Sequence, residues 1–249
     1  MNKKLHVLAI SSFAVHGTAS LKVFTAILGE KILPVPSKIL NGLTNMSLVT
    51  TFDPPFKDLL SSSLALAKAR ELQLIVYIGY LGKPENADII LKLLDEYAFL
   101  IQYIIVDPVS GDNNRLYVEE SIVAAWPSLI KKADFTFPNQ TELQIYGGGD
   151  NDAVSFREKF PQTQLIAKSV LSDNDEIGIQ YFGNSYFDYF LPRLSKNFGG
   201  TGDVLLAHFI LYYFYNTYSI EQALKTALDQ THAIIARTIL ENSTDLLIS

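Results

Sequence analysis

No cysteine occurs among the 249 residues, and the chain has only two methionines, four histidines and one tryptophan. Without cysteine the chain has no disulfide framework, no thiolate metal site and no cysteine nucleophile. The four histidines, at positions 6, 16, 208 and 232, have no spacing typical of metal ligands. The lack of thiols also suits the cytoplasm, where we expect the protein.

Charged residues are scarce as well, at 18% of the chain, and the formal net charge is −6. A net negative charge repels phosphate backbones, so we expect no nucleic-acid partner. Long apolar runs are also missing. The longest, 204–215, is interrupted by His208 and is shorter than the roughly 18–20 residues that span a bilayer. We therefore expect no membrane-spanning segment.

Apolar residues make up 48% of the chain, and short apolar runs alternate with longer amphipathic ones. This alternation predicts βαβ units, with a mainly parallel sheet between two helical layers in a single domain over residues 1–249. The predicted strands are Leu5–Ile10, Lys31–Val35, Leu74–Ile78, Tyr103–Val106, Phe135–Phe137 and Gln164–Ala167. The predicted helices are Thr18–Leu28, Pro55–Ala69, Glu85–Tyr97, Val118–Lys131 and Gln140–Tyr146.

The pattern changes after Ala167. Two aromatic-rich runs, Gly178–Phe182 and Ser185–Phe190, flank Gly183-Asn184 and predict an antiparallel hairpin. Two long helices are expected next, over about 201–217 and 219–241. Aromatic residues at 212–215 and 218, near the end of the first of them, are interpreted as packing in the core and at an interface.

Three loops that follow predicted strands are rich in polar or glycine residues: 79–82, 107–112 and 138–142. In open α/β sheets, ligands bind at the carboxyl ends of the strands. The sequence therefore predicts that the functional site lies where these loops meet.

The segment Gly199-Gly200-Thr201-Gly202-Asp203 directly precedes an apolar helical run. Glycines at a helix start let several backbone N–H groups point one way, which favours binding of an anion such as a transferring phosphoryl group. A carboxylate at the end of such a loop can accept a proton from an attacking hydroxyl. The alternative is an ordinary loop in which Asp203 only stabilises the helix dipole.

Several other polar residues allow either a functional or a structural interpretation. Asp107, Asp112, Asn139 and Glu142 carry oxygens of the kind that hold hydrated magnesium at nucleotide phosphates. Asn139 and Glu142 also have the spacing of a capping box, and Asp107 that of a turn residue before proline. The pair 168–169 would contact phosphates or form a solvated surface pair.

These motifs occur in an order that resembles a known family. Early Ser-x-x-x-x-Gly, then Gly-Tyr-Leu-Gly, Asp-Pro-Val-x-Gly, Pro-Asn-x-x-Glu and Gly-Thr-Gly-Asp together resemble the pyridoxal kinase branch of the ribokinase-like superfamily. The resemblance extends from Ser12 to the C-terminal helix. It implies a three-layer α/β/α fold, ATP-dependent phosphorylation of a hydroxymethyl group on a pyridine ring, and a homodimer.

The resemblance also implies roles for individual residues. Asp203 corresponds to the base that deprotonates the substrate hydroxymethyl group, and the backbone amides of Gly200, Thr201 and Gly202 to the γ-phosphate site. Residues that would hold the ring are Ser12, Thr44 and Tyr80. Residues that would lie near magnesium and the ATP phosphates are Asp107, Asn139, Glu142 and Ser169, with Asp107 and Glu142 around the metal, usually through water. Lys168 is expected beside them from its place at the end of a predicted strand.

The sequence departs from this pattern at several points. Leu43 stands where many relatives have a histidine, and Phe137 where many have a threonine that in some helps to hold a monovalent cation. Thr18-Ala19-Ser20 replaces a segment in which relatives often have another glycine. Two alternatives therefore stay open: a hydroxymethylpyrimidine kinase of thiamine synthesis, and a non-catalytic relative that binds pyridoxal phosphate.

Overall fold

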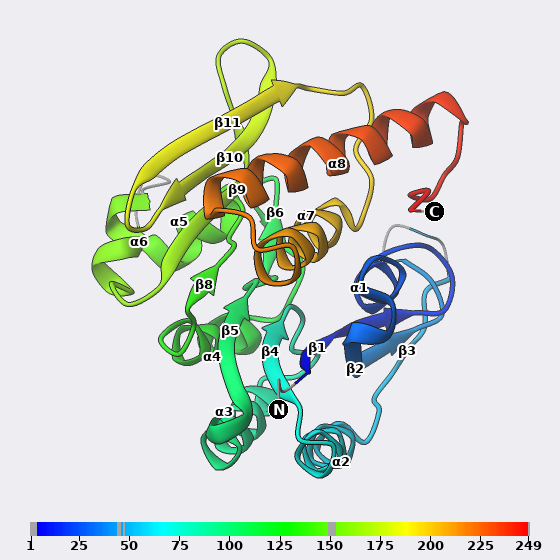
Figure 1. Cartoon of the computed structure of the whole chain (residues 1–249). Helices are drawn as coiled ribbons and strands as arrows, with labels where there is room; N and C mark the ends of the chain where they lie inside the picture. Colours follow the sequence, from blue (N-terminus) through cyan, green and yellow to red (C-terminus); the bar gives the residue numbers. More distant parts are fainter. Residues whose placement is uncertain (1–3, 44–45, 47, 149–152, 249) are drawn as a thin grey trace.

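The computed structural model describes residues 4–43, 46, 48–148 and 153–248. In this part of the chain a nine-stranded sheet has the order β11-β10-β9-β8-β5-β4-β1-β2-β3 and lies between two layers of helices (Figure 1). The three-layer α/β architecture with a mainly parallel sheet is the fold class that the sequence predicted.

Six strands form the parallel part of the sheet. Each predicted parallel strand is present, and several are longer than expected: β1 (Leu5–Ala14), β2 (Ile32–Leu40), β4 (Gln73–Ile78), β5 (Ile101–Val106), β8 (Phe135–Thr136) and β9 (Gln164–Leu171). Val7, Leu8, Ala9 and Ile10 of β1 are fully buried. Continuous apolar runs of this kind are expected where helices cover both faces of a sheet.

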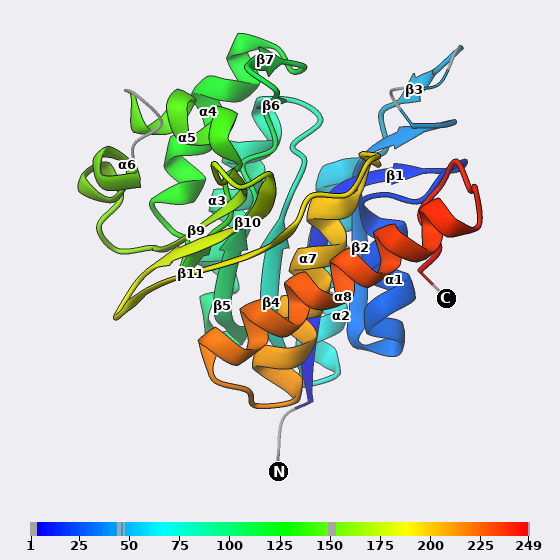
Figure 2. The same ribbon diagram turned by 90° about the horizontal axis from the view of Figure 1, so that it is seen from above.

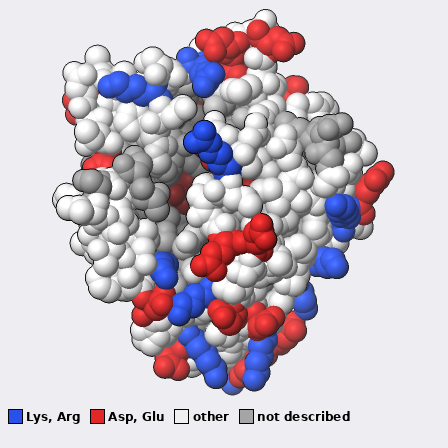
Figure 3. Space-filling view, turned by 180° about the vertical axis from the view of Figure 1, so that it is seen from behind, with Lys and Arg blue, Asp and Glu red and all other residues white. Residues whose placement is uncertain are grey.

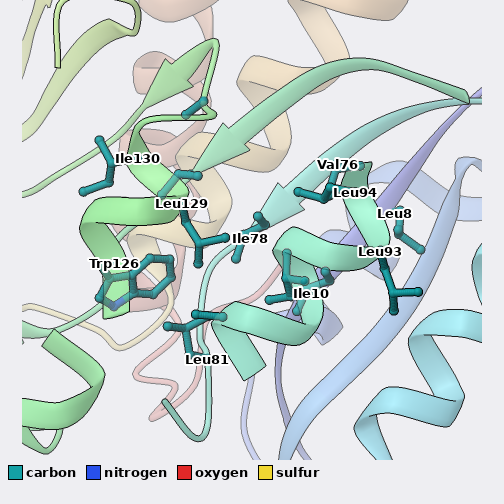
Figure 4. Packing of buried hydrophobic residues seen from close by; sticks show 14 of the residues in the cluster. Leu8, Ile10, Val76, Ile78, Leu81, Leu93, Leu94, Trp126, Leu129 and Ile130 are labelled. Carbon is teal, nitrogen blue, oxygen red and sulfur yellow. The ribbon is translucent and has the colours of Figure 1, made fainter. Parts of the chain in front are cut away.

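One face of the sheet is covered by α2 (Phe56–Ala69), α3 (Glu85–Glu96), α4 (Glu120–Ile130), α5 (Gln140–Gly147) and α6 (Ala153–Lys159). Figure 4 shows part of this core, where Leu93, Leu94, Trp126 and Leu129 from α3 and α4 pack near Ile78 and Val76 of β4. This core anchors the strands whose carboxyl ends form the candidate site.

The other face is covered by α1 (Leu21–Leu28), α7 (Thr201–Ile210) and α8 (Ile220–Leu240). Helices α7 and α8 run next to each other across this face (Figure 2). Every residue from Val204 to Ile210 is buried, so α7 is apolar on nearly all sides apart from its first turn. The packing therefore fixes the helix start that carries the glycine-rich loop.

The predicted hairpin is confirmed: β10 (Glu176–Phe182) and β11 (Tyr186–Pro192) pair antiparallel at one edge of the sheet. The sequence analysis missed helix α6 and the short strands β3 (Thr51–Phe52), β6 (Gly111–Asp112) and β7 (Arg115–Leu116). Strands of two residues are too short to give a periodic pattern.

Two predicted helices have different ends in the structure. The regular helix expected over 201–217 stops at Ile210 and continues as a π-helical turn, Leu211–Tyr215, in which Asn216 N–H donates to the Leu211 carbonyl at 3.1 Å. The helix expected from Thr18 begins only at Leu21, because Ser20 has a non-helical backbone (φ 52°, ψ −132°). Residues before Leu21 line the candidate site instead.

Acidic and basic side chains are interspersed on the face shown in Figure 3, most densely along its lower edge. Among the described residues, no helix has both the length and the apolar character that crossing a membrane requires.

Candidate active site

A cavity of about 560 Å³ opens at the carboxyl ends of the parallel strands. Residues from all three loops that the sequence analysis singled out line it, including Tyr80, Asp107 and Asn139. The segment Phe198–Asp203 forms another wall. Because parallel strands end at one edge of a sheet, polar side chains that are far apart in the sequence meet here.

The glycine-rich loop begins α7. Gly200 is its N-cap residue and has φ 89°. A Cβ on Gly200 would lie 2.7 Å from the Thr18 carbonyl oxygen, so the loop packs directly against the segment before α1. A side chain at this position would be strained for both reasons. Since the first N–H groups of a helix have no intrahelical acceptor, the first turn of α7 is suited to bind an anion in the cavity.

Asp203 lies in the first turn of α7 and lines the cavity. Its Oδ2 accepts a hydrogen bond from the Ser20 backbone N–H at 2.8 Å. Burial raises the pKa of Asp203 to about 6; nearby Asp107 adds to the rise, while the Ser20 hydrogen bond and Lys168 oppose it. A carboxylate with this pKa is largely ionised at neutral pH, yet is a stronger base than an exposed aspartate.

Lys168 and Asp107 form a buried ion pair inside the cavity wall. Lys168 Nζ lies 2.5 Å from both carboxylate oxygens, and the two residues are only 7% and 2% exposed. Burial alone would lower the pKa of Lys168, but Asp107 and Glu142 outweigh it and raise the pKa. The interpretation of Lys168 as a solvated surface residue is therefore wrong, because it lies within β9 and faces the cavity.

Ser169 differs from its neighbour. It is exposed, has φ 57°, and falls at a register shift between β9 and β10. The bulge interrupts the strand alternation, so consecutive residues Lys168 and Ser169 both line the cavity.

Asn139 and Glu142 form the capping box of α5 that their spacing predicted. Asn139 Oδ1 accepts from Glu142 N–H, and Glu142 Oε2 accepts from Asn139 N–H, both at 2.9 Å. Glu142 Oε1 accepts from Ser110 N–H at 3.0 Å. Burial raises the pKa of Glu142 to about 8, against the effect of Lys168. Asn139 lines the cavity, whereas Glu142 braces the loop behind it.

The cavity offers few protein side chains that could bind a metal ion directly. Among the described residues, no three carboxylate or imidazole side chains gather as metal ligands. Asp107 and Asp112 line the cavity, and their oxygens fit an ion that is bound chiefly by nucleotide phosphates and water. Backbone amides donate to both oxygens of Glu142, so any contribution of Glu142 to the metal site would act through water, as the resemblance implies.

Three residues were expected to hold the ring of the substrate. Ser12 and Tyr80 line the cavity, while Thr44 lies outside the described residues. Leu43 lines it too and presents an apolar surface there. Phe137 does not line the cavity. It is fully buried, with its ring 5.2 Å from that of Phe209.

Some cavity residues were not predicted as site residues, among them Ser11, Ser20, Tyr117 and Phe198. Ser20 had a signal in the sequence, because it lies in the altered segment Thr18-Ala19-Ser20. The others belong to no motif, and only the folded chain brings them to the cavity.

The comparisons with known proteins agree with this geometry. No protein-family model matches the chain. A pyridoxal kinase of Dictyostelium discoideum is 29% identical over 160 residues, which are 52% of this chain and 50% of that protein. A hydroxymethylpyrimidine/phosphomethylpyrimidine kinase of Aquifex aeolicus is 30% identical over 165 residues, or 62% of this chain and 64% of the relative. The chain thus spans about half to two thirds of these relatives' lengths.

Among solved structures, the pyridoxal kinase from Entamoeba histolytica superposes with a TM-score of 0.86 at 21% identity, covering 98% of this chain and 93% of that one. The chain therefore has the ribokinase-like fold. Its glycine-rich loop before Asp203 lies at the carboxyl ends of the parallel strands, and its sequence is similar to those of pyridoxal kinases.

Proposed function

We propose that this protein is an ATP-dependent kinase that phosphorylates the hydroxymethyl group of pyridoxal, pyridoxine or pyridoxamine, as in salvage of vitamin B6. The observation that supports this most is the position of Asp203. Its carboxylate, with a pKa raised to about 6, lies in the first turn of α7 and in the same cavity as Lys168. A base, an anion site and a cation are the groups that phosphoryl transfer to an alcohol needs.

In the proposed reaction, Asp203 accepts the proton of the substrate hydroxymethyl group. The oxygen then attacks the γ-phosphorus of ATP, the bond from that phosphorus to the bridging oxygen breaks, and ADP leaves. The backbone amides of Gly200, Thr201 and Gly202 stabilise the charge on the transferring group. Lys168 contributes a positive charge near the same place, since a Cβ on Gly202 would lie 3.4 Å from its Nζ.

Magnesium bound with the nucleotide would neutralise phosphate charge. Asp107 and Asp112, which line the cavity, would lie on the metal side, and Glu142 would act through water. Asn139 and Ser169 would contact the phosphates. Ser12, Tyr80 and Thr44 would hold the ring. The threonine that helps to hold a monovalent cation in some relatives is replaced by buried Phe137, so we expect activity to depend little on K⁺.

A second candidate is phosphorylation of hydroxymethylpyrimidine, favoured by the match to the Aquifex aeolicus kinase and by the apolar Leu43 in the ring wall. A non-catalytic binding role is less well supported, because Asp203 and its loop are intact. The deciding experiment compares ATP-dependent phosphorylation of pyridoxal, pyridoxine, pyridoxamine and hydroxymethylpyrimidine, with and without K⁺. Turnover of a pyridine alcohol at the highest kcat/KM is expected. Preference for the pyrimidine, or no turnover, would overturn the proposal.

We also propose that the protein is a homodimer. Phe13, Val15 and Phe52 are 37%, 60% and 56% exposed near the ends of β1 and β3, which leaves apolar surface to bury. Light scattering at micromolar concentration should give twice the chain mass, and a monomer mass would contradict the proposal.

A further inference from the structure

Ser20 adopts a backbone conformation that suits glycine better than serine. Its φ of 52° and ψ of −132° place it in a region that L-residues rarely occupy, while glycine enters it freely. Strain of this kind persists where surrounding structure imposes it, and it often occurs at functional sites. The question is therefore what the serine side chain contributes that glycine would not.

The backbone contacts of Ser20 do not require a side chain. Its N–H donates to Asp203 Oδ2 at 2.8 Å, and its carbonyl accepts from Val23 N–H at 2.9 Å, which begins α1. In this conformation the carbonyl accepts the hydrogen bond at the start of α1 while the N–H points toward Asp203. Glycine could make both contacts with less strain, so they do not explain the hydroxyl.

The hydroxyl of Ser20 has a partner in the cavity wall. Ser12 Oγ donates to Ser20 Oγ at 2.8 Å, and both residues line the cavity. Two hydroxyls joined by one hydrogen bond keep one free donor and several free lone pairs. Leu43 in the same cavity presents only apolar atoms. The Ser12–Ser20 pair is thus a polar element in a partly apolar wall.

We propose that Ser20 is a specificity-determining residue for the ring substrate. Its hydroxyl, held by Ser12, hydrogen-bonds with a polar atom of the ring, either the ring nitrogen or a ring hydroxyl, while its backbone N–H orients the Asp203 carboxylate. This inference rests on the proposed function. It links ring recognition and the base through one residue, because the same serine contacts Ser12 and Asp203.

The test uses Ser20→Gly and Ser20→Ala, which both remove the hydroxyl and keep the backbone N–H. With pyridoxine, the KM of both variants should rise roughly three- to tenfold, the usual effect of one neutral hydrogen bond, and kcat should change much less. Two analogues identify the partner: 3-deoxypyridoxine lacks the ring hydroxyl, and a benzene analogue lacks the ring nitrogen. For the analogue without the partner atom, wild type and variants should have similar KM values.

Thermal unfolding separates this role from a structural one. Ser20→Gly relieves the strained conformation and should unfold at a higher temperature than wild type, whereas Ser20→Ala should not. Weaker substrate binding in a more stable protein cannot come from lost folding. Should Ser20→Ala fail to fold, the glycine variant decides the test alone.

An unchanged KM in the glycine variant would overturn the inference, and so would a fall in kcat with unchanged KM, since Ser20 would then act on the base only. Equal effects of the substitution on pyridoxine and both analogues would also overturn it. If the wild type phosphorylates pyridoxine and the variants have the same KM as the wild type, only this inference is refuted and the proposed function stands. A wild type with no turnover of any ring alcohol refutes the proposed function.

Discussion

The two ends of α7 differ sharply in chemistry. At its start, the first turn faces a polar cavity with Asp203, and Lys168 and Asp107 form a buried ion pair nearby. At its other end, the π-helical turn packs aromatic rings against the sheet: the ring of Phe214 lies 4.8 Å from that of Tyr103, and the ring of Tyr213 lies 5.7 Å from that of Phe135. The same helix thus has one end at the polar cavity and the other end in an aromatic core.

This difference separates activity from stability along one element. Charges in the cavity are kept out of bulk water, which is unfavourable for folding but useful for chemistry. The aromatic end has apolar rings in contact, which stabilise the fold without requiring charge. Substitutions at the cavity end of α7 should therefore lower activity, and substitutions at the aromatic end should lower stability. Four experiments test this.

The largest effect is expected for Asp203→Asn. Loss of the base should lower kcat about 10²–10⁴-fold, while the KM for ATP changes little because the amide keeps the shape of the side chain. The unfolding temperature should not fall, since a half-buried charge is removed and the amide oxygen can still accept from Ser20 N–H. Steady-state kinetics and thermal unfolding measure both. A rate near that of wild type would mean that Asp203 only stabilises the helix dipole, and it would contradict the proposed mechanism.

Lys168→Met should lower both activity and stability. It leaves Asp107 buried without its partner, which typically costs about 3–5 kcal/mol of unfolding free energy. The matched control is the double variant Lys168→Met/Asp107→Asn, which removes both charges and should recover much of the stability but not the activity. Urea unfolding and initial rates distinguish the two. Full activity in the double variant would show that Lys168 is only structural.

The pH dependence of kcat/KM should reflect Asp203. Because its pKa is raised to about 6, the carboxylate becomes protonated as the pH falls through 6 and then cannot accept a proton. Activity should be constant above this range and about tenfold lower one pH unit below it. Burial is the main cause of this raised pKa, with smaller contributions from Ser20 N–H, Asp107 and Lys168 around the carboxylate. A profile that is flat down to pH 5 would contradict the assignment.

Phe214→Leu should have the smallest effect of the four, and it should lower stability without changing activity. It removes aromatic contacts with Tyr103 and Phe135, each worth about 0.5–1.5 kcal/mol, so the free energy of unfolding should fall. Both kcat and KM should stay at wild-type values, because the π-helical turn is at the far end of α7 from the cavity. The pH profile should also be unchanged. An altered kcat would mean that the two ends of the helix are coupled.

Much of the fold was predictable because burial on both faces makes a strand apolar throughout, as in Leu74–Ile78. The motif loops were predictable because they follow such strands. The π-helical turn was not, since its aromatic residues fit a regular helix equally well by sequence. The two-residue strands β6 and β7 pair with each other, across a tight turn at Asn113 and Asn114 (φ 50° and 59°), and are too short to give a periodic pattern.

The site was predicted in part. Composition could not decide whether Lys168 was solvated, because its burial depends on Asp107, 61 positions away in the sequence. The spacing of Asn139 and Glu142 correctly indicated a capping box, but not that Ser110 N–H would occupy the remaining carboxylate oxygen. Ser20 lies in the altered segment Thr18-Ala19-Ser20, but its contact with Asp203 follows only from the packing of α1 against α7.

The hydrogen bond from Ser20 to Asp203 joins residues 183 positions apart. At synthesis rates of about 5–20 residues per second, Ser20 is made roughly 10–40 s before Asp203. During that interval the proposed ring-binding residues have neither the proposed base nor the start of α7 beside them. Closing so long a loop is also entropically unfavourable, so this contact should form late in folding. Translation that stops before α7 therefore leaves no partly active product.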